Sequence, residues 1–410
     1  MRFLSNTVQR YAWGSPTGIP EILGLPATEE PAAELWMGAH PVAPSQLLDE
    51  AGQPVASLLE WIDTAPEAAL GQASIDAFGA RLPFLLKILS AATALSIQAH
   101  PSAAQARAGF ARENAAGIPL DAAHRNYKDD AHKPELICAL TEFHALCGFR
   151  EPAAIAATLD RFAAALTAAG ENAQLPALEA WRTALDADTS AAALQQATGL
   201  LLEQRDTYGA FADVLAGISI EPVGDEHPSH AGSAVDPVLT LREVQADFPH
   251  DPGVLVALML NRLRLEPGEA LALDAGILHA YLGGLGVEIM ASSDNVMRGG
   301  LTSKHIDVAE LDAVVSYQPG LPALAAPDAA GVLRGATDDF ALQGITAAQE
   351  LAVHRAGPAI LLCTSGTFTC NDGTRLQAGD SVFVAAEEPA PIVTGAGHLF
   401  VATTGLSHQP

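Results

Sequence analysis

The spacing of apolar residues divides the chain into segments that differ in their pattern of apolar and polar positions. Across residues 1–150, short apolar runs alternate with Gly and Pro, as in RLPFLLKILS (81–90) and PELICALTEFHALCGF (134–149). Short apolar runs bounded by turn residues are typical of β-strands. The more polar stretch 107–131 is expected to form a loop or short helices. We therefore predict a mostly β structure for this part of the chain.

The texture changes at Glu151. The segment EPAAIAATLDRFAAALTAAG (151–170) has Pro near its start, Ala and Leu throughout and Gly at its end. These are the boundary signals of a helix. Similar segments continue to about residue 220, DEHPSHAGSAVDP (225–237) is a polar loop, and LTLREVQADF (239–248) indicates one more helix. The sequence therefore predicts a helical insert over residues 151–249.

Strand-like texture returns from residue 254. The segment VLVALMLNRLRLEPGEALALDAGILHAYL (254–282) contains apolar runs broken by Pro-Gly and Asp-Ala-Gly. Residues 319–340 are rich in Pro, Gly and Ala and are expected to connect two parts of the fold, and 341–406 predicts an antiparallel sandwich. Strands, then helices, then strands indicate a mainly β, α+β fold with a helical insert rather than alternating β-α units.

Composition narrows the function classes. The formal net charge of −27 argues against nucleic acid and anionic membranes as partners. No apolar run reaches the ~18 residues that a membrane-spanning helix needs, and the first residues show no secretory signal. Four cysteines are too few for a disulfide framework, so we expect reduced thiols in a cytoplasmic protein. Neither Gly-x-Gly-x-x-Gly nor a P-loop occurs.

A polar face is predicted in LSIQAHPS (95–102). If this segment is a strand, Ser96, Gln98 and His100 point to one side, because side chains alternate along a strand. The amide oxygen of Gln98 and the imidazole of His100 are possible metal ligands. Read alone, this pattern favours a hydrogen-bonded polar surface over a pair of metal ligands.

Two further segments carry metal-ligand chemistry. Glu135 lies just inside the apolar run of HKPELICAL (132–140), where a carboxylate is costly to bury unless it is paired or bound to metal. The alternative is an edge-strand Glu that faces solvent. The segment GILH (276–279) has the Gly-x-x-His spacing of the second conserved motif of cupin barrels, where the imidazole binds a metal. A mixed oxygen and nitrogen set of Gln98, His100, Glu135 and His279 suits Zn²⁺.

Charged residues gather around these segments. Glu288, Asp294, Arg298 and Lys304 fall within 17 residues of one another, either as a solvated loop or as the wall of an active site. The chain has only four lysines, and all of them lie in the blocks richest in polar signals. Cations from these blocks could hold a phosphate group, namely Lys87, Lys133, Arg298 and Lys304.

At this point the sequence closely resembles the type I mannose-6-phosphate isomerase (phosphomannose isomerase) family of the cupin superfamily. The resemblance extends to about residue 320 and is weaker beyond it. Several motifs of eight or more residues in the right order carry it: AELWMGAHP (33–41), LPFLLKIL (82–89), LSIQAHP (95–101), YKDDAHKPE (127–135), ALTEFHALCGFR (139–150) and HAYLGGLGVEIMASSDNVMRGGLTSK (279–304).

The resemblance implies a fold and an activity. It implies cupin jelly-roll barrels: a discontinuous metal-binding domain over 1–150 and 250–320, an inserted all-α domain over 151–249, and a C-terminal barrel without metal ligands over 321–410. It implies a zinc-dependent aldose–ketose isomerase that interconverts mannose 6-phosphate and fructose 6-phosphate through a cis-enediol(ate), with one zinc per chain. We expect a cytoplasmic monomer with a phosphosugar substrate and a link to GDP-mannose biosynthesis.

The resemblance also assigns roles to residues. The zinc ligands would be Gln98, His100, Glu135 and His279, and Arg298 would be essential for catalysis. Ser96, Lys87 and Lys304 match phosphate-site positions, Trp13 matches a pocket wall, and Tyr281, Glu288, Asp294 and Lys133 match active-site positions. We take Glu288 as the first candidate for the general base. Two departures, Ser303 for an expected Pro and Gly299-Gly300 for Ala-Gly, predict a looser loop before Lys304.

Two alternatives stay open on sequence grounds. One is another cupin metalloenzyme that acts on a phosphosugar, or an iron oxygenase, although a fourth ligand such as Gln98 leaves less room for O₂ chemistry. The other is a non-catalytic sugar-binding bicupin, which would be expected to have lost ligands or catalytic charges.

Overall fold

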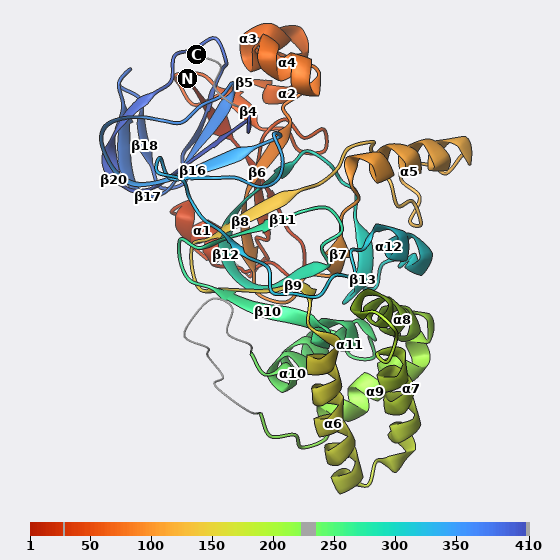
Figure 1. The fold of residues 1–410 in the computed structure, drawn as a ribbon. Coiled ribbons are helices and arrows are strands. Elements are labelled where there is room, and N and C mark those ends of the chain that lie inside the picture. The colour runs from red at the N-terminus through yellow and green to blue at the C-terminus, as the bar shows by residue number, and fades with distance from the viewer. Residues whose placement is uncertain (28, 223–234, 407–410) are drawn as a thin grey trace.

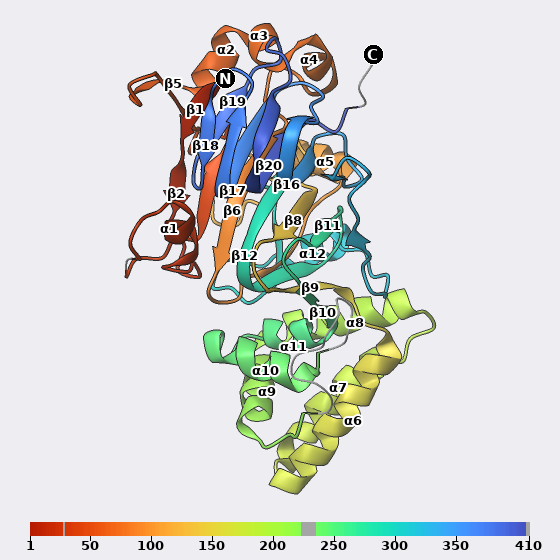
Figure 2. The same cartoon turned by 90° about the vertical axis from the view of Figure 1, so that its left-hand side faces the viewer.

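The computed structural model describes residues 1–27, 29–222 and 235–406, and it consists of two large β-sheets with a group of helices at one end (Figure 1). This arrangement confirms the predicted class, mainly β with a helical insert. The two sheets lie above the helical group in the view of Figure 2.

The central sheet has eleven strands and is organised around one long strand, β12 (His279–Ala291). The first part of β12 pairs with β7 and β9, and its second part pairs with β6 and β8. A register shift between Tyr281 and Gly283 separates the two parts. The other strands of this sheet are β2 (Thr7–Gln9), β3 (Glu34–Met37), β6 (Phe84–Ala91), β7 (Ile97–Ala99), β8 (Glu135–Ala139), β9 (Phe143–Phe149), β10 (Leu260–Leu265), β11 (Ala270–Leu273), β13 (Met297–Gly300) and β14 (Leu324–Ala325).

The second sheet has nine strands and joins the two ends of the chain. Its C-terminal strands pair antiparallel, as predicted for 341–406, and β1 pairs with β19, so the N-terminal strand lies in this sheet as well (Figure 1). The predicted domain boundaries stay a prediction, and this sheet crosses them. Its strands are β1 (Arg2–Ser5), β4 (Gln46–Leu48), β5 (Pro54–Ser57), β15 (Val332–Leu333), β16 (Ala341–Ala352), β17 (Ala359–Cys370), β18 (Arg375–Gln377), β19 (Ser381–Val384) and β20 (Ile392–Thr403).

The helical insert has the boundaries that its sequence signals indicate. Its first helix, α6 (Pro152–Ala169), has Pro in its first turn and ends at Gly170, whose φ of 79° is left-handed. Buried Phe162, Trp181 and Leu201 pack in its core. Part of the predicted polar loop at 225–237 lies outside the described residues. The insert continues with η1 (Asn172–Gln174), α7 (Leu175–Ala184), α8 (Ser190–Glu203), α9 (Arg205–Gly217) and α10 (Pro237–Asp247).

The strand prediction for the first residues after 254 is wrong. Residues 253–258 form helix α11 (Gly253–Leu258), and the strand β10 begins only at Leu260. All six residues of α11 are buried, and a short, wholly apolar run has no period that distinguishes a buried strand from a buried helix.

The first 150 residues also contain more helix than their texture indicates. The polar stretch that begins near residue 107 belongs to α5 (Ala103–Ala115), which a reciprocal capping box between Ser102 and Gln105 starts. The remaining helices are α1 (Gly18–Ile22), α2 (Leu58–Thr64), α3 (Pro66–Leu70), α4 (Gln72–Phe78) and α12 (Val308–Val314).

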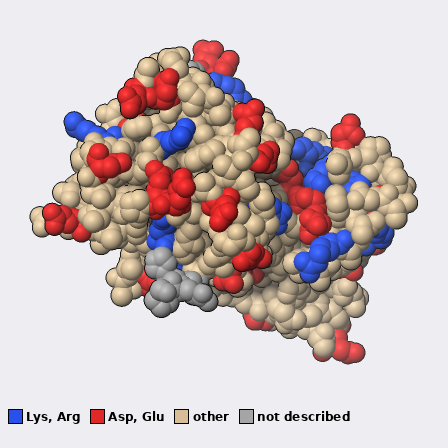
Figure 3. All heavy atoms as spheres, turned by 90° about the horizontal axis from the view of Figure 1, so that it is seen from above, with Lys and Arg blue, Asp and Glu red and all other residues tan. Residues whose placement is uncertain are grey.

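The surface reflects the acidic composition. Asp and Glu side chains are spread over the face in Figure 3, with fewer Lys and Arg between them. In the described part of the chain, no helix has the length and apolar character needed to cross a membrane. The four cysteines are buried and free.

Candidate active site

The ends of three strands bring two histidines and a glutamate together. His100 directly follows β7, Glu135 begins β8 and His279 begins β12. Each residue offers one nitrogen or oxygen atom that lies within 4.8 Å of the other two, and all three side chains are buried. Within the described residues this is the one such group of His, Cys, Asp or Glu side chains. The structure thus assembles three of the four predicted zinc ligands.

The hydrogen bonds of the two imidazoles fix their tautomers. His100 Nδ1 lies 2.7 Å from the carbonyl oxygen of Asn295, and His279 Nδ1 lies 2.9 Å from that of Ile277. A carbonyl can only accept, so each Nδ1 carries the proton and each Nε2 presents a lone pair. Burial, together with the positive charge of Lys133, lowers the pKa of His100 to about 4, which keeps the ring neutral at pH 7.

The lone pairs converge on the Glu135 carboxylate. Glu135 Oε1 lies 3.3 Å from His100 Nε2, and Glu135 Oε2 lies 3.3 Å from His279 Nε2. Burial opposes ionisation of Glu135, but Lys133, whose Nζ is 2.9 Å from the carboxylate, and His100 hold its pKa well below the ordinary value. Both Nε2 atoms and one carboxylate oxygen are buried without a hydrogen-bond partner. Three unpartnered electron-pair donors fit a metal cation and would be costly without one.

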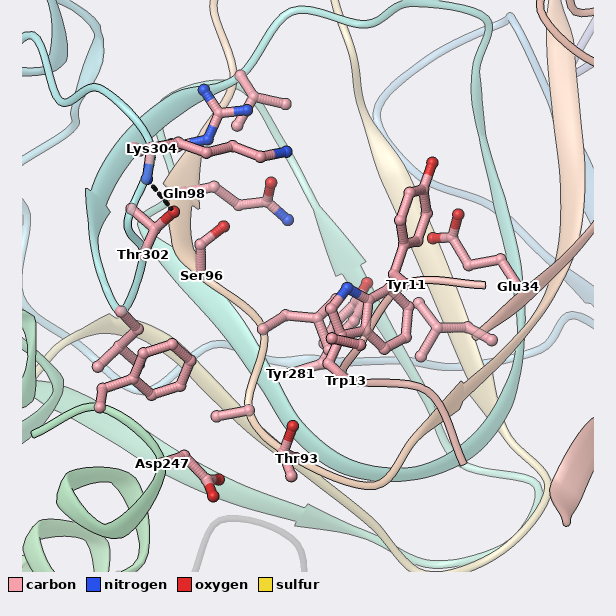
Figure 4. A pocket seen from close by; sticks show the side chains of 18 of the residues that line it. Tyr11, Trp13, Glu34, Thr93, Ser96, Gln98, Asp247, Tyr281, Thr302 and Lys304 are labelled. Atoms are coloured by element: carbon pink, nitrogen blue, oxygen red, sulfur yellow. Dashed lines mark hydrogen bonds between the residues drawn. The ribbon is translucent and has the colours of Figure 1, made fainter. Parts of the chain in front are cut away.

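Gln98 lies beside this group. It is directly opposite His279 in the β7–β12 ladder and opposite Arg298 in the β7–β13 ladder. Its side chain points into the same cavity as Ser96 (Figure 4). The strand alternation behaves as predicted, since the intervening Ile97 and Ala99 are buried in the core. A fourth metal bond from the Gln98 amide oxygen stays a prediction.

One large cavity opens in front of the metal group. It has a volume of about 610 Å³ and draws its walls from the central sheet, the N-terminal segment and the helical insert. Ten of the thirteen predicted site residues line it, and His100, His279 and Asp294 do not. The ten are Trp13, Lys87, Ser96, Gln98, Lys133, Glu135, Tyr281, Glu288, Arg298 and Lys304.

One end of the cavity is cationic. Lys304 lines it together with Ser96 and Thr302 (Figure 4), and Arg298, which also lines the cavity, is close enough for its charge to act on Lys304. Among the described residues, neither the Arg298 guanidinium nor the Lys304 ammonium forms an ion pair. Burial, and then the neighbouring charge of Arg298, lower the pKa of Lys304. Two cations without a carboxylate partner in a chain of net charge −27 are suited to bind an anion.

The opposite side of the cavity is a buried network of charges. Lys87 Nζ lies 3.3 Å from Glu34 Oε1 and 3.2 Å from Glu288 Oε2. Tyr281 donates its hydroxyl proton to Glu288 Oε1 at 3.0 Å. Burial raises the pKa of Glu288, and the negative charges of Glu135 and Glu34 add to this, although Lys87 opposes it. A carboxylate with a raised pKa is suited to proton transfer near neutrality.

The position of Lys87 bears on its predicted role. Its ammonium is buried between two carboxylates, whose negative charges raise its pKa although burial opposes this. Its partner Glu34 lies across the cavity from Lys304 (Figure 4). These contacts favour a role beside Glu288 over contact with a phosphate at the Lys304 end. Glu34 was missed by sequence reasoning, although it carries the signal used for Glu135, a Glu inside an apolar run.

Asp294 is placed differently from the other predicted residues. It does not line the cavity and is half-exposed, and its Oδ2 lies 3.3 Å from His40 Nε2. The hydrogen bond from His40 lowers the pKa of Asp294 despite partial burial. The structure thus pairs Asp294 with His40, a residue that sequence reasoning did not single out.

Aromatic and helical residues complete the walls. Trp13 stacks on Tyr11 with their ring centroids 5.7 Å apart. Asp247 and Phe248, at the end of α10, also line the cavity. Sequence reasoning missed these two because nothing in their local pattern distinguishes the end of this helix from that of any other helix.

The fold and the site together fit a cupin-type metalloenzyme with a cavity suited to an anionic ligand. The family described as phosphomannose isomerase type I, catalytic domain, matches residues 1–152. Over most of its length the chain is similar to mannose-6-phosphate isomerases: 40% identical to that of Salmonella typhimurium (97% of this chain, 98% of the relative) and 32% to that of Homo sapiens (94% and 93%).

A solved structure agrees with these relatives. The crystal structure of a mannose 6-phosphate isomerase bound with zinc and yttrium superposes with a TM-score of 0.82 at 39% identity, covering 99% of this chain and 100% of the other. The chain therefore belongs to the type I phosphomannose isomerase family, and the family predicted from the sequence motifs is confirmed.

Proposed function

We propose that this chain is a zinc-dependent mannose-6-phosphate isomerase that interconverts mannose 6-phosphate and fructose 6-phosphate. The observation that carries the proposal is the group of donor atoms on His100, Glu135 and His279 that have no hydrogen-bond partner among the described residues. They lie next to a cavity lined by Arg298 and Lys304, which form no ion pair within the same residues. We also propose a cytoplasmic monomer, which the four free, buried thiols support for the compartment. A solution mass near 42.4 kDa would agree with a monomer, and twice that mass would contradict it.

The zinc would be held by His100, Glu135 and His279, with Gln98 as the fourth ligand. When bound, zinc supplies a Lewis acid that polarises a sugar oxygen. The carbonyl oxygens behind the two imidazoles orient the rings, so Asn295 and Ile277 act as positioning groups. Lys133, 2.9 Å from Glu135, is the candidate for opening the sugar ring.

The two ends of the cavity set the orientation of the substrate. The phosphate would bind Lys304 and Ser96 at the cationic end. The sugar would then extend past Trp13 and Tyr281 (Figure 4) toward Glu288, which accepts the hydrogen bond of Tyr281. An aldose–ketose isomerisation moves a proton from C2 to C1 while a second proton passes between the oxygens of these carbons. Glu288 would take the proton from C2, leaving a cis-enediolate, and return it to C1.

Arg298 would stabilise the enediolate. The backbone of Arg298 lies opposite Gln98, beside the metal group. Arg298 is therefore nearer to the metal group than Lys304, which lies at the far end of the loop. Burial lowers the pKa of Arg298, but a guanidinium still does not act as a base at neutral pH. A preorganised cation in a cavity largely shielded from water stabilises charge that develops in the transition state.

Lys304→Ala is expected to raise KM for mannose 6-phosphate about tenfold or more with a smaller change in kcat, because a charge-assisted contact to the phosphate is lost. Steady-state kinetics measures this. Lys128→Ala is the matched control, since Lys128 donates to the carbonyl oxygens of Leu120 and Ala122 and does not line the cavity. An unchanged KM in Lys304→Ala would remove Lys304 from the phosphate site.

The raised pKa of Glu288 predicts a pH effect with a definite sign. The base must be ionised, so kcat/KM should fall as pH decreases through the pKa of Glu288, above the ordinary value of 4.5. Glu34→Gln removes a negative charge that raises this pKa, and it should move the acidic limb to lower pH. The pH profiles of both proteins measure this, and a shift to higher pH would exclude Glu288 as the base.

The proposed function is tested by adding mannose 6-phosphate to the purified protein and following fructose 6-phosphate with a coupled assay. We expect turnover, and no comparable turnover of glucose 6-phosphate. Conversion of another phosphosugar alone would indicate a different cupin metalloenzyme. Binding without conversion would indicate a non-catalytic sugar-binding bicupin.

A further inference from the structure

The loop that carries Arg298 and Lys304 is in close contact with helix α11, which comes directly after the helical insert. At the contact, Gly300, two residues after Arg298, lies against Gly253, the first residue of α11. A Cβ on Gly300 would lie 2.3 Å from the Cα of Gly253, which is too close for any side chain. Gly300 also has a φ of 130°, which favours glycine. This contact fixes Gly300 against α11, and the looser loop predicted from Gly299 and Ser303 stays a prediction.

A single carboxylate joins the two segments. Asp251 is buried, with 8% of its surface exposed. Its Oδ2 accepts the backbone N–H of Thr302 at 3.0 Å, and its Oδ1 accepts the backbone N–H of Gly253 at 2.7 Å. Asp251 thus fixes the loop after β13 relative to the turn between α10 and α11.

The backbone on both sides of this bridge adopts an uncommon conformation. His250 has a φ of 62° and Leu301 has a φ of 53°, both left-handed and both on residues other than glycine. Such conformations persist only where the surrounding contacts hold them, and they cluster at functional sites. They adjoin the two residues that the bridge connects, Asp251 and Thr302.

The bridge leads directly to the cationic end of the cavity. Thr302 lines the cavity, and its Oγ1 accepts the backbone N–H of Lys304 at 3.1 Å (Figure 4). Asp251 therefore acts on Lys304 through Thr302 without touching the cavity itself. On the other side of the turn, Asp247 and Phe248 form part of the cavity wall.

We propose that Asp251 is a positioning residue through which the turn that follows the helical insert, between α10 and α11, sets the geometry of the phosphate site. This inference rests on the proposed function, because it takes the Arg298–Lys304 end as the place of the substrate phosphate. An Asp is suited to the task because each of its oxygens can accept one N–H. An Asn would offer one acceptor only and would turn an N–H group toward the second donor.

The test compares Asp251→Asn with wild type, using inorganic phosphate as the probe in calorimetry and as a competitive inhibitor. We expect the Kd of phosphate and the KM for mannose 6-phosphate to rise together by about five- to tenfold, as the loss of one charge-assisted hydrogen bond implies. We expect kcat to change by less than about twofold, because the metal group and Glu288 are not contacted. Asp251→Glu, which keeps both acceptors, should recover part of the affinity.

Asp213→Asn is the matched control. Asp213 lies in α9 and holds the same turn, because it accepts the backbone N–H of His250 at 2.8 Å. It makes no hydrogen bond to the loop after β13, which carries Thr302 and Lys304. The Asp213→Asn variant should have a lower melting temperature than wild type and an unchanged Kd for phosphate. An Asp251→Asn protein with a lower melting temperature and an unchanged phosphate Kd would overturn the inference, since Asp251 would then serve stability alone.

A second measurement applies if the Asp251 variants do not fold. In wild type, the amide of Thr302 should exchange slowly with deuterium, and exchange as fast as that of a free amide would overturn the bridge. Failure of the proposed function has a different signature: the wild type would neither convert mannose 6-phosphate nor lose phosphate binding on Lys304→Ala. If wild type passes both tests and Asp251→Asn binds phosphate equally well, the positioning role alone fails.

Discussion

Replacing Arg298 with alanine is expected to lower kcat by about 100- to 1,000-fold, the usual cost of removing a group that stabilises developing charge. The guanidinium lines the cavity and has no ion pair within the described residues, so its charge is available to the substrate. Since the enediolate carries a charge that the ground state lacks, the loss should appear in kcat more than in KM.

Two controls distinguish this role from simpler ones. Arg112→Ala removes a surface arginine that pairs with Glu310 and should leave the kinetics unchanged. Arg298→Lys keeps the positive charge but not the planar fork and should recover only part of kcat. If Arg298→Ala changes KM alone, Arg298 is a phosphate anchor and not a catalytic residue.

The second large effect is expected at Glu135. Glu135→Ala should lose bound zinc and reduce isomerase activity by more than about 100-fold, since altering even the groups behind a metal ligand costs 10- to 100-fold. It would also leave two buried imidazoles without the carboxylate between them. Metal analysis and kinetics on the same preparation measure both losses.

Glu142→Gln is the control, because Glu142 is an exposed carboxylate that pairs with His144 and Arg264 at the surface. It should retain zinc and activity. A Glu135→Ala protein that binds zinc as wild type does would contradict the ligand set.

The metal group was predictable from sequence because residue type and strand alternation suffice to find it. Gln98 and His100 share a strand face, Glu135 interrupts an apolar run, and His279 follows a Gly-x-x-His turn. Each signal was weak alone, and the family motifs combined them. The structure adds what no local pattern contains, the two carbonyl groups that fix the tautomers of His100 and His279.

The rest of the site depends on contacts between distant segments. Asp251 meets Thr302 across 51 residues, and Lys87 meets Glu34 across 53. The residues around a side chain in the sequence do not reveal a partner so far away along the chain. The sequence therefore suggested Lys87 as a phosphate ligand and offered no reason to choose Asp251. Lys87 was one of only four lysines in a chain that otherwise uses arginine for positive charge, which indicated importance but not its neighbours.

The fold was predictable to a similar extent. Boundary signals predicted the insert well, because Pro152 and Gly170 act locally on the backbone. The pairing of β1 with β19 could not be predicted, because strands at opposite ends of a chain carry no mark of their partner. Helix α11 was misread for the opposite reason: full burial of Gly253–Leu258 removes the amphipathic period on which secondary-structure prediction relies.

The central claim is that His100, Glu135 and His279 hold a zinc ion on which isomerisation depends. The most direct measurement is a back-titration of chelator-treated wild type with Zn²⁺, read as fructose 6-phosphate formed from mannose 6-phosphate. The account predicts negligible activity without metal, a linear rise on addition of zinc, and a plateau at one zinc per chain. Full activity in the metal-free protein would contradict it.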